Sequence, residues 1–213
     1  MSDEEAVSRD KRVELIAAIL LSIATLLTAW AAYQATRWSG EQSEDYTSAS
    51  ALRTESVRAA NVANRQVEID VATFLDWLDA NVGGDQALAD DIHDRMRDEF
   101  LPAFDEWLAS APAGNEVPDG TPFELDSYGL AAQEESERLE ERAAARFDEG
   151  REANQIGDNF VLAAVMLASV LFFSGLAGTL DSRTPQILLL SLAGVMLVAG
   201  AVVIAVLPPS VGL

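Results

Sequence analysis

Apolar residues gather into three long runs that are separated by strongly polar sequence. Residues 15–33, 161–180 and 187–207 contain no Asp, Glu, Lys, Arg or His. The hydrocarbon core of a bilayer needs about 20 apolar residues to be crossed by a helix. The pattern therefore predicts three membrane-spanning helices, at residues 15–38, 158–180 and 185–207.

The polar region after the first span still has the periodicity of helices. The first helix is predicted to run on to about Ala80, with Val67, Val71, Phe74 and Leu78 on one face. Gly83 and Gly84 then favour a helix end. Asp85 is a suitable N-cap for a second helix. Its apolar face would comprise Leu88, Ile92, Met96, Phe100, Phe104, Trp107 and Leu108.

Pro102 lies inside that second pattern, so we expect a kink or break near Phe100. A Pro- and Gly-rich loop at residues 111–127 follows. A charged helix is then predicted from Tyr128 into the second span. The predicted fold is all-α, with three spans, a long antiparallel and coiled-coil-like helical stalk, and a small helical tip. Residues 1–14 would be a charged tail, and residues 39–157 the acidic stalk and tip.

Stripes of small residues predict how the first two spans pack, since small side chains let membrane helices approach closely. One stripe comprises Ala18, Ser22, Thr25, Ala29 and Thr36, and the other Gly150, Gly157, Ala164, Ala168 and Gly175. Antiparallel alignment pairs Ala18 with Gly175, Thr25 with Ala168, Ala29 with Ala164, and Thr36 with Gly157. The same alignment predicts an Arg37–Asp158 ion pair at the membrane edge, where an unpaired charge is costly.

Charge is segregated from the apolar runs. The 213 residues are 49% hydrophobic, yet the formal net charge is −21. Acidic residues crowd residues 41–151, and Lys11 is the only lysine. An acidic, lysine-poor surface suits a high-salt environment, which predicts a halophilic source. It argues against binding to nucleic acids, because these require a basic face.

Basic residues before the first span predict the orientation in the cell membrane. Arg9, Lys11 and Arg12 directly precede the apolar run, which favours a cytoplasmic N-terminus. Residues 41–151 would then lie outside the cytoplasm. The first run is longer than the apolar core of a signal peptide, so we expect an uncleaved anchor.

Candidate chemistry is sparse. His93 is the only histidine, so one chain cannot assemble a multi-histidine metal site or a Ser-His-Asp triad. Residues 90–94 spell DDxxD, a pattern that can hold Mg²⁺, but Asp91 can instead pair with Arg95 on a solvated helix face. The uncharged spans argue against a pump or an ion-coupled transporter. We therefore predict no catalytic, cofactor-binding or metal-binding residue.

Residues 30–42 read Trp-Ala-Ala-Tyr-Gln-Ala-Thr-Arg-Trp-Ser-Gly-Glu-Gln. This run resembles one in an uncharacterised family of prokaryotic membrane proteins, which is defined by a domain of unknown function. Similar features recur at residues 100–108 and 149–155. The resemblance implies one span, a helical domain and later spans, and it implies no activity.

The leading functional hypothesis is a non-enzymatic scaffold or accessory subunit that is anchored in the lipid bilayer. It would present its acidic helical domain to partners, as a homo-oligomer or with another membrane protein. Small residues on the third span offer an oligomer face, namely Ser191, Ala193, Gly194, Ala199 and Gly200. The alternative is a homo-oligomeric ion channel with Ser22, Thr25 and Thr28 near the pore and an acidic vestibule. A membrane enzyme that uses the DDxxD carboxylates ranks third.

Overall fold

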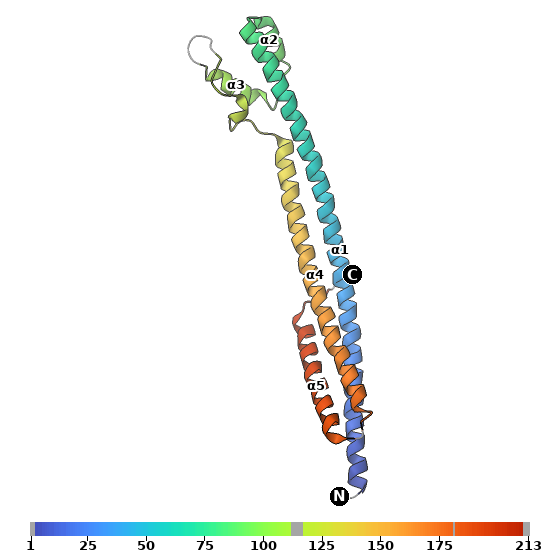
Figure 1. Ribbon diagram of the computed structural model, residues 1–213. Helices are drawn as coiled ribbons and strands as arrows, with labels where there is room; N and C mark the ends of the chain where they lie inside the picture. The colour runs from blue at the N-terminus through green and yellow to red at the C-terminus, as the bar shows by residue number, and fades with distance from the viewer. Residues whose placement is uncertain (1–2, 112–116, 181, 211–213) are drawn as a thin grey trace. The chain divides into compact units, whose positions relative to one another are not determined.

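A computed structural model describes residues 3–111, 117–180 and 182–210, with side chains from residue 13 onward. All the regular elements in these residues are helices (Figure 1). The α-helices are α1 (Asp3–Gly83), α2 (Gln86–His93), α3 (Leu101–Ala109), α4 (Ala131–Ala177) and α5 (Arg183–Val206). A short 3-10 helix, η1 (Pro122–Glu124), precedes α4. The prediction of an all-helical chain is confirmed.

Helix ends follow the local sequence closely. α1 stops at Gly83, and Gly84 has a φ of +82°, a conformation that favours glycine. The Asp85 side chain caps α2 by accepting a hydrogen bond from the backbone N–H of Leu88. Two boundaries differ from the prediction. α1 already includes residues 3–14, and α4 begins at Ala131 rather than at Tyr128.

The kink or break predicted near Phe100 is a complete break, and it starts earlier along the chain. α2 ends at His93, and turns fill the residues up to Phe100. Pro102 lies in the first turn of α3, where its missing N–H has no helical partner to lose. The turns bury Met96 and Phe100 and let Arg97 bond to Asp70 on α1.

The chain divides into two compact units, residues 1–47 with 146–213 and residues 48–145. We call the first the membrane unit, because it contains the apolar stretches of α1, α4 and α5. These helices are long and apolar enough to cross a membrane. Small side chains fill the interior of the unit, including Ala24, Ala31, Ala163 and Ala193. α5 packs on α4 at Gly200, where an added Cβ would lie 3.1 Å from Leu167 Cγ (Figure 1).

The predicted small-on-small contact between the first two spans is wrong within this chain. Ala18, Ser22, Thr25, Ala29 and Thr36 are all exposed. On α4, Ala168 is exposed, Ala164 is half-buried, and nothing lies within 4 Å of a Cβ built on Gly175. The buried face of α1 is instead the adjacent one, with Ala17, Ala24 and Ala31 at heptad spacing.

The reason is that small residues in this unit pack against large ones. On the buried face of α4, Val170 belongs to one core cluster with Ala24 of α1 and Ala193 of α5, and Leu167 lies against Gly200 of α5. Gly157 is buried as predicted, but its neighbours are Trp38 Cβ, 3.5 Å from a built Cβ, and the Ala35 carbonyl oxygen at 3.7 Å. These neighbours lie on either side of the predicted partner, Thr36. On α5, Ala193 and Gly200 are buried inside the unit rather than left for an oligomer contact.

The second unit, residues 48–145, is called the tip unit here. Its part of α1 buries Ala49, Ser56, Ala63, Asp70 and Trp77 at heptad spacing. Against this face α4 buries Ser136, Leu139 and Ala143. The Ser56 hydroxyl lies 3.0 Å from the Ser136 carbonyl oxygen and 3.1 Å from its hydroxyl, and Arg53 lies 3.8 Å from Glu140.

An aromatic core closes the tip unit. It comprises Phe74 and Trp77 from α1, Phe100 before α3, and Phe104 and Trp107 on α3. Phe123 and Tyr128 pack on it from the segment before α4. The aromatic residues thus form a packed core.

Candidate functional site

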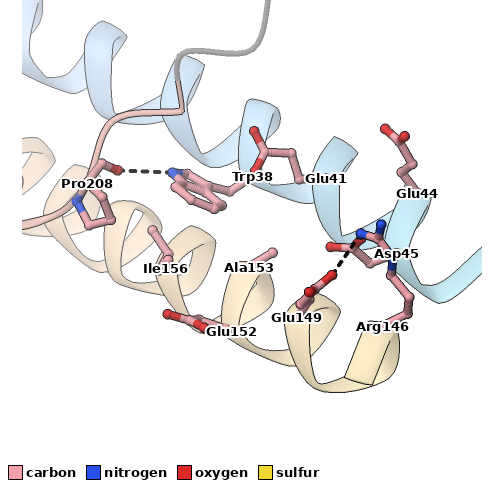
Figure 2. Close-up of a pocket in the computed structure, with 10 residues that line it drawn as sticks. All are labelled: Trp38, Glu41, Glu44, Asp45, Arg146, Glu149, Glu152, Ala153, Ile156 and Pro208. Carbon is pink, nitrogen blue, oxygen red and sulfur yellow. Dashed lines mark hydrogen bonds and ion pairs between the residues drawn. The ribbon is translucent and has the colours of Figure 1, made fainter. Parts of the chain in front are cut away.

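The membrane unit contains an acidic cavity of about 500 Å³ between α1 and α4 (Figure 2). It lies next to the apolar stretches of both helices, where these become polar. Its lining consists of Trp38, Glu41, Glu44, Asp45, Arg146, Glu149, Glu152, Ala153, Ile156 and Pro208. We refer to it below as the acidic cavity.

Helical spacing brings these residues to one place. Trp38, Glu41 and Asp45 follow one another at steps of three and four, so they share the face of α1 that is turned to α4. At the polar end of the cavity, α1 and α4 approach each other closely at Gly150. A Cβ at Gly150 would lie 2.6 Å from the Tyr46 ring, which stacks on Phe147 with centroids 5.1 Å apart.

Electrostatically the cavity is unbalanced. Arg146 is the one basic residue in its lining, and its Nη1 lies 3.3 Å from Asp45 Oδ1 and 2.8 Å from Glu149 Oε2. Glu41, Glu44 and Glu152 add further carboxylates (Figure 2). The cavity therefore has an excess of negative charge and would attract cations or basic groups. Within the described ranges, no group of three or more His, Cys, Asp and Glu side chains is arranged to hold a metal ion.

The apolar end of the cavity meets the segment that follows α5. The Trp38 indole Nε1 donates a hydrogen bond to the Pro208 carbonyl oxygen at 3.3 Å. The Ser210 backbone N–H donates to Gln34 Oε1 at 2.8 Å, and its hydroxyl donates to Glu41. Residues that follow α5 thus return to the end of the apolar stretch of α1.

Asp158, one of the two predicted membrane-edge residues, lines a smaller hollow of about 220 Å³. Gly157 and Asp158 lie in its wall with Ala35. Asp158 Oδ2 accepts a hydrogen bond from Asn154 Nδ2 at 3.1 Å. The Arg37–Asp158 ion pair stays a prediction.

The DDxxD segment is held by surface pairs. Arg95 Nη2 lies 2.9 Å from Asp91 Oδ2, which confirms the predicted pair. His93 Nε2 lies 3.0 Å from Asp105 Oδ1 on α3. These contacts tie α2 to its neighbours and give the segment a structural role.

A buried polar network in the tip unit was not foreseen from the sequence. Asp70 is 1% exposed and accepts hydrogen bonds from Arg97 Nε at 2.8 Å and Nη2 at 2.9 Å. The Tyr128 hydroxyl donates to the same carboxylate at 3.1 Å. The hydrogen bonds that Arg97 donates to the Asp70 carboxylate raise the pKa of Arg97 further above its ordinary value, so the guanidinium stays charged.

Tyr128 gives the tip unit a pH dependence. Burial, and next the Asp70 charge, raise the pKa of Tyr128 above its ordinary value. The folded state therefore favours the neutral phenol, and its stabilisation is complete below the unfolded pKa of about 10. It is lost as the pH rises above about 10, because the unfolded chain ionises first.

We expect the urea concentration at the unfolding midpoint of the tip unit to fall as the pH rises above about 10. Tyr128→Phe removes the ionising group and should make this decrease smaller. Tyr33→Phe, in the membrane unit, is the control that should leave the fall unchanged.

The chain matches no protein-family model, no curated protein and no solved structure. The family resemblance of residues 30–42 therefore stays a prediction.

Proposed function

We propose that this protein is a membrane-anchored scaffold whose acidic helical tip is presented to partner proteins. The observation that carries the anchor is the distribution of side-chain size in the membrane unit. Helices α1 and α5 turn small side chains such as Ala24, Ala31 and Ala193 inward, whereas large apolar side chains such as Leu26 and Phe172 point outward, 73% and 64% exposed. In water this arrangement would be unfavourable. In a bilayer, lipid chains cover the large side chains, and small ones allow close helix packing.

We propose further that α1 and α4 together form the antiparallel stalk. The contacts between Ser56 and Ser136 and between Arg53 and Glu140 support it in the tip unit. In the membrane unit, the contact of Tyr46 with Phe147 supports the same direction. In each of these pairs the residue number rises along α1 as it falls along α4, so the two numbers have nearly the same sum in both units. Two helices that run antiparallel show this pattern.

This stalk predicts a specific disulfide, and the absence of native cysteine makes the test clean. Ser56→Cys with Ser136→Cys should oxidise within one chain, because the two hydroxyls are 3.1 Å apart. Ala63→Cys with Ser136→Cys displaces one partner by a heptad and should not crosslink. Gel mobility with and without reductant measures both. Crosslinking of the second pair instead of the first would contradict the proposed register.

The partner surface is proposed on the tip unit. Apolar side chains remain exposed there within a strongly acidic region, among them Leu75, Val82 and Leu88 at 55%, 71% and 47%. A partner with basic residues around an apolar patch would complement this surface. Because basic residues precede the first span, we propose that the N-terminus is cytoplasmic and that the tip unit lies outside the cytoplasm. Protease added to intact cells should then remove the tip.

The membrane unit is also proposed to associate with a second copy or with another membrane protein. The stripe of small residues from Ala18 to Thr36 is exposed. Its Ser22, Thr25 and Thr36 hydroxyls donate hydrogen bonds to carbonyl groups of their own helix, so they do not need a partner from another helix. The same bonds leave these hydroxyls less available to line a pore. This supports a scaffold over a channel.

Photo-crosslinking in native membranes tests the proposal. A photoreactive residue at Val82 should form adducts with protein, whereas one at Val195, 65% exposed on α5, should form adducts mainly with lipid. Protein adducts at neither position would contradict the scaffold. Ion flux through liposomes containing the purified protein would favour the channel instead.

A further inference from the structure

The segment that follows α5 forms hydrogen bonds with side chains of α1. α5 ends at Val206, and residues 208–210 have no regular secondary structure. Gln34, Trp38 and Glu41 hold this segment, and their spacing places them on successive turns along one face of α1. They bond, in turn, to Ser210, Pro208 and again Ser210.

The chemistry of the segment leaves it few other attachments. Pro208 and Pro209 have no backbone N–H, so Ser210 supplies the first donor after the turn that ends α5. That donor meets Gln34, whose side chain is 1% exposed at the end of an apolar stretch. A buried amide oxygen without a donor is unfavourable, so Gln34 favours the bound segment.

The bound segment is also part of the acidic cavity. Pro208 and Trp38 both line the cavity, and the hydrogen bond between them forms its apolar end (Figure 2). Glu41 has two roles, since it lines the cavity and accepts the bond from the Ser210 hydroxyl. Movement of the segment would remove one wall of the cavity and free the Glu41 carboxylate.

We propose that residues 208–210 form a releasable strap, which closes the apolar end of the acidic cavity when bound to Gln34, Trp38 and Glu41 and opens it when these bonds break. The strap depends on a few hydrogen bonds, each of which contributes modestly once water can replace it. Any cationic group that binds Glu41 in the cavity competes with Ser210 for the same carboxylate. The strap and the cavity are therefore coupled.

A single cysteine reports on the strap in this cysteine-free chain. Ser210→Cys places a thiol on the strap, and Ser136→Cys is its matched control, because both serines are 8% exposed. Labelling of each thiol by a water-soluble maleimide is followed over time in the full-length protein in detergent. Ser210→Cys keeps the backbone N–H that bonds to Gln34 and replaces the hydroxyl that bonds to Glu41 with a weaker thiol donor. If the strap opens, Ser210→Cys should be labelled faster than Ser136→Cys.

Gln34→Leu is the decisive second substitution, since it keeps the side-chain volume and removes the acceptor of the Ser210 N–H. Combined with Ser210→Cys, it should raise the labelling rate by about tenfold, the effect of one lost hydrogen bond to a buried group. Combined with Ser136→Cys, it should leave the rate unchanged. Trp38→Phe keeps an aromatic ring and removes the indole donor, so it should raise the labelling rate of Ser210→Cys by a smaller factor. It tests the strap in place of Gln34→Leu if the Gln34 variant does not accumulate.

Three results would overturn the strap. One is equal labelling of Ser210→Cys and Ser136→Cys in the unchanged protein, because the segment would then be a fixed part of the bundle. Another is a rate at Ser210→Cys that neither Gln34→Leu nor Trp38→Phe alters. The last is faster labelling at both cysteines, because the substitution would then loosen the whole protein rather than release the strap.

Discussion

Replacing Arg97 with Met should destabilise the tip unit by about 3–5 kcal/mol, because it leaves a buried carboxylate without its cation. Asp70 is 1% exposed, and two of its hydrogen bonds come from the Arg97 guanidinium. The Tyr128 hydroxyl alone would remain as a donor to that carboxylate. Met keeps much of the apolar stem of Arg, so the expected effect comes from the lost charge and hydrogen bonds.

The measurement is urea unfolding of the full-length protein, with Trp77 and Trp107 as fluorescent reporters in a Trp30→Phe, Trp38→Phe background. Arg95→Met is the matched control, since Arg95 pairs with Asp91 on the surface, and such pairs contribute about 0–1 kcal/mol. Asp70→Leu combined with Arg97→Met should recover much of the loss, because no buried charge is then left unpaired. Equal effects of Arg97→Met and Arg95→Met would contradict a stabilising role of the buried pair.

The network around Asp70 shows what sequence patterns could not supply. Asp70 interrupts a run of apolar positions and continues the heptad spacing of Ala49, Ser56 and Ala63, which could have marked it as buried. Its partner could not be found in the same way. Arg97 reaches Asp70 only because the chain leaves the helix after His93, and this break was predicted too late along the chain.

Prediction of the helices succeeded where one physical rule dominated. Uncharged runs of sufficient length marked the three apolar helices, and Gly84 and Asp85 marked the end of α1 and the start of α2. The contact faces were harder to predict. Small residues occur on two faces of the apolar stretch of α1, and the buried face contains Ala24, which packs in one cluster with the larger Val170 of α4. A prediction based on the small residues of each helix alone does not take account of the side chains on the opposite helix.

The acidic cavity could be predicted only in part. Acidic residues on both helices near the membrane edge are visible in the sequence. The hollow between them depends on the close approach of Tyr46 to Gly150 and on the return of Pro208 and Ser210 to α1. Both are long-range contacts without a local sequence signal.

Truncating Phe104 to Ala should have an effect as large as the loss of Arg97. Phe104 is 0% exposed at the centre of the aromatic core of the tip unit. Its ring centroid lies 4.8 Å from that of Trp77, 5.9 Å from that of Phe100 and 5.8 Å from that of Trp107. Removal of a buried Phe ring costs about 3–5 kcal/mol, through lost burial and the cavity that remains. Lost edge-to-face contacts with the neighbouring rings are part of that loss.

The same fluorescence assay measures this loss, and Leu108→Ala is its control on the same helix. Leu108 is 37% exposed, so its truncation should lower stability far less. Because Phe104 belongs to residues 48–145, labelling of Ser210→Cys in the membrane unit should not change. A small effect of Phe104→Ala, similar to that of Leu108→Ala, would mean that the aromatic residues of the tip can repack around the missing ring. Faster labelling at Ser210→Cys would instead show that the two units unfold together.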